Sequence, residues 1–407
     1  MGFGDDDAAF LAANGYTVAR VGVMWKAVEP TPGNYDDDYL DSIARTVKAL
    51  ASHGIYSLLD MHQDSYNEAF NGQGFPDWAV LDPTSQDATW DAFWNNTQVA
   101  GTGVRDRFAR FWQHVAERFT GNPAVLGYDL MNEPHVGTQS NSNCTIGYCP
   151  QINKIRAAYN DATSAIRAVD ATHPVFWERS LAALFTPPSI DAGATGNSYH
   201  VYCPVQPTDD PNVAAVRNTV VCPPAEAVQL ALMTAQSHNA DSAPLVTEFG
   251  STPDTTELTR VAGELDQTMV GWTEWTYHRT GVTDFTLTPS VVDDPRLPPT
   301  GNNVNSSVLS ALTRPYPLAV AGTPTNWSYN PEDRTFRLTY RPTRADGNGT
   351  FPAGSITELA APALNYPHGY TAQVTGGTIT SPPNAPRITI ASTTGADTIT
   401  VTLTGNR

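Results

Sequence analysis

The chain of 407 residues exceeds the usual size of one domain, so we expect one large domain and a smaller attached module. Hydrophobic residues make up 40% and charged residues only 16% of the sequence, which excludes wholesale disorder. The net charge of −18 repels phosphate groups, so nucleic acid and anionic membranes are excluded as favoured partners.

The sequence contains no apolar run long enough to span a membrane, and the segment GFGDDD after Met1 lacks the features of a signal peptide. The four cysteines form two close pairs, Cys144 with Cys149 and Cys203 with Cys222. Each pair can close a small loop, and disulfides are favoured over free thiols. We therefore expect a secreted or cell-envelope protein.

Most of the chain alternates between helical and strand-like patterns. Apolar residues at helical spacing predict a helix over residues 36–54, which Gly54 ends, and the short apolar run at 55–61 predicts the strand that follows. The same alternation continues, which is typical of a parallel sheet covered by helices. The predicted strands are residues 17–23, 55–61, 124–131, 173–178, 197–202, 244–249 and 271–277.

This pattern predicts an α/β protein whose nearest closed architecture is the (β/α)8 TIM barrel. Residues 5–15 fit a helix before the first visible strand, so the first barrel strand is expected to lie before Met1. An open seven-stranded sheet is the alternative. After Thr313 a proline-rich connector leads to segments that alternate with period two, which predicts an antiparallel β-sandwich. We predict a catalytic barrel over residues 1–315 and a C-terminal sandwich over 316–407.

Polar side chains follow the predicted strands, where the active site of a β/α barrel lies. Glu133 and Glu248 each end a strand, so both can reach one pocket. Two carboxyl groups about 5–5.5 Å apart act in a retaining glycosidase as nucleophile and acid/base. Arg20 is a charge inside an otherwise apolar strand and needs an anionic partner.

Other chemistries have weaker support. The sequence has no HExxH, GxSxG or GxxxxGK[ST] motif. Asp60, His62 and Asp64 are spaced to bind a metal at the end of a strand, but no second cluster completes a ligand set. We therefore predict neither a metal nor a cofactor.

The segments RVGVMWKAVEPTPGNYDDDYLD, LLDMHQD, FWNN, YDLMNEP, YHVY, VTEFG and GWTEW resemble those of endoglycoceramidases of glycoside hydrolase family 5. The resemblance covers nearly the whole chain. It implies that Glu133 is the acid/base and Glu248 the nucleophile. It also implies a set of substrate-binding and orienting residues: Arg20, His62, Asp64, Trp94, Asn132, His200, Tyr202 and Trp275.

The resemblance implies a hydrolase that cleaves the β-linkage between oligosaccharide and ceramide in glycosphingolipids. We expect a monomer that makes transient contact with lipid aggregates or a membrane surface. The alternatives are a glucosylceramidase, a steryl glucosidase, an endo-β-glucanase or another retaining β-glycosidase of the family. A non-catalytic glycolipid-binding protein is the alternative outside enzymes.

Two segments are expected to form the side of the site that meets the leaving group. One is the loop over residues 66–90, with Phe75 and Trp78, and the other runs from Cys203 to Cys222. Apolar residues in such βα loops can meet a lipid, but a small satellite core is the alternative for Phe75 and Trp78.

Overall fold

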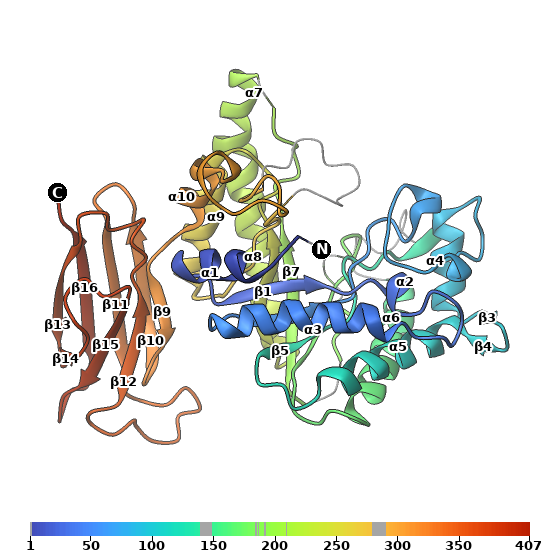
Figure 1. The fold of residues 1–407 in the computed structure, drawn as a ribbon, viewed down its shortest axis with the longest axis horizontal. Coiled ribbons are helices and arrows are strands. Elements are labelled where there is room, and N and C mark those ends of the chain that lie inside the picture. Colours follow the sequence, from blue (N-terminus) through green and yellow to red (C-terminus); the bar gives the residue numbers. More distant parts are fainter. Residues whose placement is uncertain are drawn as a thin grey trace.

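The computed structural model shows two parts side by side, a strand-and-helix part and a sandwich of strands (Figure 1). A membrane-crossing helix is absent from the described part of the chain, since none of its helices combines the necessary length with an apolar composition. The structure describes residues 2–138, 149–183, 185, 187–190, 193–208, 210–278 and 290–407.

Six parallel strands form the sheet of the larger part. Their order is β1-β2-β5-β6-β7-β8. The strands of this sheet therefore lie side by side in the order in which they occur along the chain, as in a β/α barrel. The parallel register joins, for example, Val18 to Tyr56 and Val175 to Thr195. The strands are β1 (Val18–Gly22), β2 (Tyr56–Asp60), β5 (Val125–Asp129), β6 (Val175–Glu178), β7 (Thr195–Val201) and β8 (Ala243–Phe249).

The segment predicted as a seventh strand is not a continuous strand. It meets β8 and the residue after it through two isolated parallel bridges, Val246 with Trp272 and Gly250 with Trp275. The offset is 26 residues at the first bridge (272 − 246) and 25 at the second (275 − 250). The register therefore shifts by one residue, which interrupts the ladder. The prediction of a regular strand over 271–277 is wrong for this reason.

The sheet stays open between β1 and this segment in the described part of the chain. β1 is an edge strand that pairs with β2 alone. A cavity of about 980 Å³ is lined on one side by β1 and on the other by residues 272–278. An eight-stranded barrel has one further strand at this position. The fold is thus a TIM-like barrel that is open at one edge.

Helices cover the outer face of the sheet. In α3 the buried residues are Leu40, Ile43, Val47 and Leu50, whose helical spacing places them on the face toward the strands. The helix predicted over residues 36–54 is therefore present. The helices are α1 (Asp5–Ala13), α2 (Trp25–Val28), α3 (Asp37–Ser52), α4 (Gln86–Trp94), α5 (Val104–Phe119), α6 (Gln151–Arg167), α7 (Pro211–Val216), α8 (Cys222–Asn239), α9 (Thr255–Thr268) and α10 (Ser306–Leu312).

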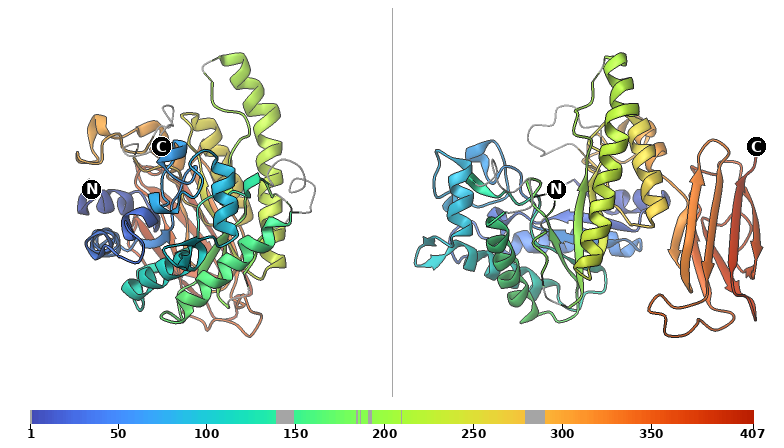
Figure 2. Two further views of the ribbon diagram at one scale, coloured as in Figure 1. Left: turned by 90° about the vertical axis from the view of Figure 1, so that its right-hand side faces the viewer. Right: turned by 180° about the vertical axis from the view of Figure 1, so that it is seen from behind.

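The C-terminal part is the predicted antiparallel β-sandwich (Figure 2). Its two sheets have four strands each, in the orders β10-β11-β16-β13 and β14-β15-β12-β9. Phe336, Leu338 and Tyr340 alternate with less buried residues along β11 and fill the space between the sheets. The strands are β9 (Tyr316–Ala319), β10 (Thr323–Asn330), β11 (Thr335–Arg341), β12 (Ile356–Ala360), β13 (Tyr370–Thr375), β14 (Gly377–Ile379), β15 (Arg387–Ser392) and β16 (Ile399–Gly405).

A buried ion pair lies where the two parts meet, and a hydrogen bond from Trp327 of the sandwich reaches it. Arg314, between α10 and β9, donates from Nε and Nη2 to Oδ2 of Asp266 on α9, at 2.8 and 2.6 Å. Trp327 of β10 donates from Nε1 to the other oxygen of Asp266 at 3.3 Å. The ion-paired side chains are only 5% and 7% exposed. The domain boundary after residue 315 remains a prediction.

Asp266→Ala is expected to lower the free energy of unfolding by about 3–5 kcal/mol, because it leaves the buried Arg314 guanidinium without its partner. Trp327→Phe removes a single hydrogen bond and is expected to cost about 1 kcal/mol. Urea denaturation followed by circular dichroism measures both. Equal losses in the two variants would contradict the importance of the ion pair.

Candidate active site

The two predicted glutamates meet at one pocket at the carboxyl ends of the strands. His200 lies between them, with its Nδ1 2.8 Å from Glu133 Oε1 and 3.4 Å from Glu248 Oε2. One oxygen of each carboxylate lies within 4.8 Å of the other. This close spacing is typical of retaining glycosidases. The pocket has a volume of about 220 Å³, and its lining includes Asp64, Glu133, Tyr202, Glu248 and Trp275.

Two donors hold Glu248. Arg20 donates from Nη1 to Oε1 at 2.6 Å, and the Tyr202 hydroxyl donates to Oε2 at 3.0 Å. Burial raises the pKa of Glu248, while the charge of Arg20 opposes that rise. A carboxylate beside a guanidinium keeps its negative charge, as a nucleophile requires.

Arg20 has the anionic partners that its position in β1 requires. It forms ion pairs with Asp60 at 3.0 Å, Asp129 at 2.9 Å and Glu248 at 2.6 Å. It also donates from Nη2 to Asn132 Oδ1 at 3.0 Å. The guanidinium thus connects four groups beyond β1 and fixes their relative positions.

His62 belongs to a chain of charged groups. Its Nδ1 lies 2.8 Å from Asp60 Oδ2, and its Nε2 lies 3.4 Å from Asp64 Oδ2. Burial opposes protonation, but the two carboxylates raise the pKa of His62 to about 10. The protonated ring stacks on Trp275, with 4.8 Å between ring centroids. Asp60, His62 and Asp64 thus form a chain of ion-paired side chains beside Trp275.

Glu133 has the environment of an acid. Burial raises its pKa to about 7, and the negative charge of Asp64 acts in the same direction. Its side chain is 28% exposed, whereas that of Glu248 is 8% exposed. A carboxyl group that keeps its proton near neutral pH can protonate a leaving group in the pocket.

The family model described as cellulase of glycosyl hydrolase family 5 matches residues 4–281, and that of the family's C-terminal domain matches residues 314–403. The chain belongs to glycoside hydrolase family 5. Its two carboxyl groups and their spacing are those of a retaining glycoside hydrolase. The non-catalytic alternative therefore has no support.

Endoglycoceramidase I of Rhodococcus hoagii is 31% identical over 95% of this chain and 77% of its own length. Two solved structures of endo-glycoceramidase II from Rhodococcus sp. cover 100% of this chain and 93% of theirs. One is a lactosyl-enzyme intermediate, with 27% identity and a TM-score of 0.74. The other is a ganglioside GM3 complex, with 25% identity and a TM-score of 0.75. The resemblance to endoglycoceramidases and the barrel fold are confirmed.

Three residues of this family 5 site were not predicted from the sequence. Asp129 and Glu178 are the last residues of β5 and β6. Both are carboxylates at the end of an apolar run, so the rule that selected Glu133 also applies to them. Gln63 lies in the DMHQD segment, and its side chain donates to the carbonyls of Asn132 and Glu133 at 2.7 and 3.0 Å. Its role depends on a contact across the sheet that no local pattern indicates.

Trp94, which the resemblance implied to bind the substrate, does not line the pocket between the two glutamates. The residue is 1% exposed and belongs to the main hydrophobic core. Its Nε1 donates to the carbonyl of His135 at 2.8 Å, and its ring stacks on Trp90 with 5.5 Å between centroids. In the structure Trp94 therefore packs as part of the scaffold.

The loop over residues 66–90 is a satellite core. Phe75 is fully buried, with its ring 3.9 Å from that of Tyr66 and 5.4 Å from that of Trp25. Trp78 packs on Trp25 at 5.4 Å and donates from Nε1 to the carbonyl of Glu29. Phe75 cannot meet a lipid from this position, because Trp25 of α2 packs against it, whereas Trp78 is only partly buried.

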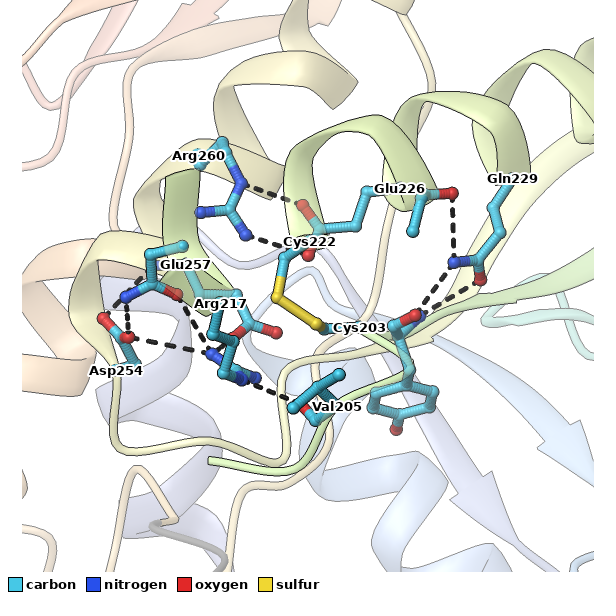
Figure 3. The surroundings of a disulfide bond; sticks show 12 residues. Cys203, Val205, Arg217, Cys222, Glu226, Gln229, Asp254, Glu257 and Arg260 are labelled. Carbon is cyan, nitrogen blue, oxygen red and sulfur yellow. Dashed lines mark hydrogen bonds and ion pairs between the residues drawn. A yellow bond between two sulfur atoms is a disulfide. The ribbon is translucent and has the colours of Figure 1, made fainter. Parts of the chain in front are cut away.

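A disulfide joins Cys203, which follows β7, to Cys222 at the start of α8 (Figure 3). The segment that it closes forms part of the pocket wall. The other predicted pair includes Cys144, which lies outside the described residues. The disulfide anchors the segment at both of its ends.

Hydrogen bonds tie this segment to the site (Figure 3). Arg217 donates from Nε to the carbonyl of Val205 at 2.8 Å and pairs with Glu257 at 2.5 Å. Gln229 of α8 accepts the N–H of Tyr202 at 3.3 Å and donates to its carbonyl at 2.8 Å. Because Tyr202 binds Glu248, the segment and Glu248 are held by one continuous set of contacts.

The pKa of Glu133 predicts a pH dependence. Glu133 holds its proton below its pKa of about 7 and loses it above, so kcat/KM on a phenyl β-glycoside should fall about tenfold per pH unit above that value. A dinitrophenyl glycoside needs no protonation of its leaving group and should not show this decline. Initial rates from pH 5 to 9 measure both. A decline of equal size on both substrates would remove Glu133 from the acid role.

Proposed function

We propose that this chain hydrolyses the β-glycosidic bond between an oligosaccharide and ceramide in glycosphingolipids. The observation that carries the proposal is the similarity of nearly the whole chain to endoglycoceramidases, one of which forms a complex with ganglioside GM3. The two glutamates at retaining distance supply the chemistry that such a reaction requires.

The reaction proceeds in two displacements. The carboxylate of Glu248 attacks the anomeric carbon, and Glu133 donates its proton to the glycosidic oxygen, which leaves with ceramide. The oligosaccharide is then bound covalently to Glu248. Glu133, now a carboxylate, takes a proton from water as the water attacks the same carbon and releases the oligosaccharide.

The neighbouring side chains position the sugar and the nucleophile. We assign Arg20 and Tyr202 to the orientation of Glu248, which both contact. The polar and aromatic groups around them are assigned to the sugar. Asn132 binds its 2-hydroxyl, His62 and Asp64 bind other hydroxyls, and Trp275 stacks on its ring.

We assign the ceramide to the segment from Cys203 to Cys222. Val205 lines the pocket beside Glu133 and is 37% exposed. Val216 and Val220 are 54% and 64% exposed and are spaced to share one helical face. α7 projects from the body of the barrel, at the top of Figure 1. Exposed apolar side chains on a segment that also lines the pocket suit a leaving group with two alkyl chains.

The proposed surroundings are extracellular or in the cell envelope, because the Cys203–Cys222 disulfide is stable in oxidising compartments. The net charge of −18 favours contact with neutral over anionic lipid. We propose that the enzyme acts as a monomer, since Glu133, His200 and Glu248 all come from one chain.

Product analysis tests the function. Thin-layer chromatography of digests of lactosylceramide, glucosylceramide, a steryl glucoside and a soluble β-glucan should show intact lactose and ceramide from the first substrate. Glu248→Ser is expected to abolish this release while glycolipid binding persists, because it removes the nucleophile and little else. Release of glucose alone, or activity confined to the glucan, would favour one of the alternatives.

A double variant tests the assignment of the ceramide. Val216→Ser with Val220→Ser should lower kcat/KM on lactosylceramide by about tenfold or more, since each exposed valine loses about 1 kcal/mol of lipid contact. Hydrolysis of an aryl β-lactoside should stay unchanged. Val228→Ser is the matched control, because Val228 on α8 is 58% exposed. Equal losses on both substrates would contradict the assignment.

A further inference from the structure

Glu178 is a third buried glutamate beside the two that carry the reaction. It ends β6, which lies between β5 and β7 in the sheet. β5 leads into the turn that bears Glu133, and β7 carries His200. The carboxylate of Glu178 therefore faces both residues. Because Glu178 is only 1% exposed, it lies behind the pocket.

Glu133 stands on a turn with a strained backbone. Its φ of +40° lies in the left-handed region, which costs a non-glycine residue about 1–3 kcal/mol. Such a conformation persists only where its surroundings hold it. Glu178 Oε2 accepts the N–H of Glu133 at 2.9 Å, on one side of the turn. On the other side, Gln63 donates to the carbonyls of Asn132 and Glu133.

The same oxygen of Glu178 also faces His200. It lies 3.5 Å from Nε2 of the ring, whose Nδ1 is 2.8 Å from Glu133 Oε1. Burial lowers the pKa of His200 to about 4, so the ring is neutral and carries a single N–H. The group at Nε2 therefore influences whether Nδ1 donates to Glu133 or accepts from it.

We propose that Glu178 is a positioning residue for the acid/base. It holds the main chain of Glu133 by accepting its N–H. It holds the carboxyl group of Glu133 indirectly, through His200, and it does not touch the substrate. The inference rests on the proposed function, since that function assigns the acid/base role to Glu133. The competing interpretation is that Glu178 only stabilises the fold.

Azide separates the two interpretations. With a dinitrophenyl β-lactoside the first displacement needs no acid, and hydrolysis of the glycosyl-enzyme still needs Glu133 as base. Azide anion attacks the anomeric carbon without a base, displaces the Glu248 carboxylate and leaves glycosyl azide. A misplaced acid/base is therefore compensated by azide, whereas a general loss of stability is not.

Glu178→Leu should lower kcat on lactosylceramide by about 10²-fold, as expected for a displaced catalytic group. Azide should accelerate its turnover of the dinitrophenyl lactoside and yield glycosyl azide. Glu178→Gln keeps an oxygen that accepts the N–H of Glu133, so its kcat should stay within about threefold of wild type. Gln63→Leu removes the hydrogen bonds on the other side of the turn and should show the same loss of kcat and the same azide response. It provides the test if Glu178→Leu does not fold.

Glu226→Leu is the matched control. Glu226 is fully buried, and its carboxylate binds Arg260 at 2.8 and 2.9 Å, next to the disulfide (Figure 3). This variant should lower the melting temperature without a response to azide.

Unchanged kcat in Glu178→Leu, or equal losses on both substrates without glycosyl azide, would overturn the proposal. Glu133→Ala separates a failure of the acid/base role of Glu133 from a failure of the positioning role of Glu178. If this variant shows no azide response, the acid/base role of Glu133 is wrong. If it responds and the Glu178 and Gln63 variants do not, only the positioning role is wrong.

Discussion

The buried guanidinium of Arg20 is the interaction on which the site depends. One side chain of β1 pairs with Asp60 of β2, Asp129 of β5 and Glu248 of β8, and is itself only 6% exposed. Three carboxylates in one buried cluster would repel each other strongly without a cation. The arginine thus lets the strands bring acidic groups together at one end of the sheet, and it fixes Glu248 in the process.

The difference between the two glutamates follows from their neighbours. Glu248 receives donors from Arg20 and Tyr202, so its ionised form is stabilised. Glu133 is buried near the negative Asp64, and its pKa rises to about 7. The proposed roles of nucleophile and acid thus match the direct contacts, because Arg20 ion-pairs with Glu248 whereas burial and Asp64 raise the pKa of Glu133. The strained turn of Glu133 adds a further requirement, which Gln63 and Glu178 meet.

The two loops that flank the site show that the role of an apolar residue depends on whether other side chains bury it. Phe75 and Val220 both follow strands of the barrel in βα segments. Trp25 covers Phe75, which becomes part of a core. Val220 stays 64% exposed on the helix that the disulfide anchors. Composition alone does not separate these cases, because burial depends on what packs against the residue.

The sequence by itself determined the fold class, the sandwich and the meeting of Glu133 and Glu248 at one pocket, because each depends on a local pattern. Helix and strand periods are visible within a segment, and parallel strands bring their carboxyl ends to one face whatever their separation in the chain. The tertiary structure alone decided that GWTEWTY is interrupted, that Trp94 is scaffold and that Glu178 faces both Glu133 and His200. These outcomes depend on contacts between elements that are distant in sequence, and periodicity carries no information about which side chains such contacts bring together.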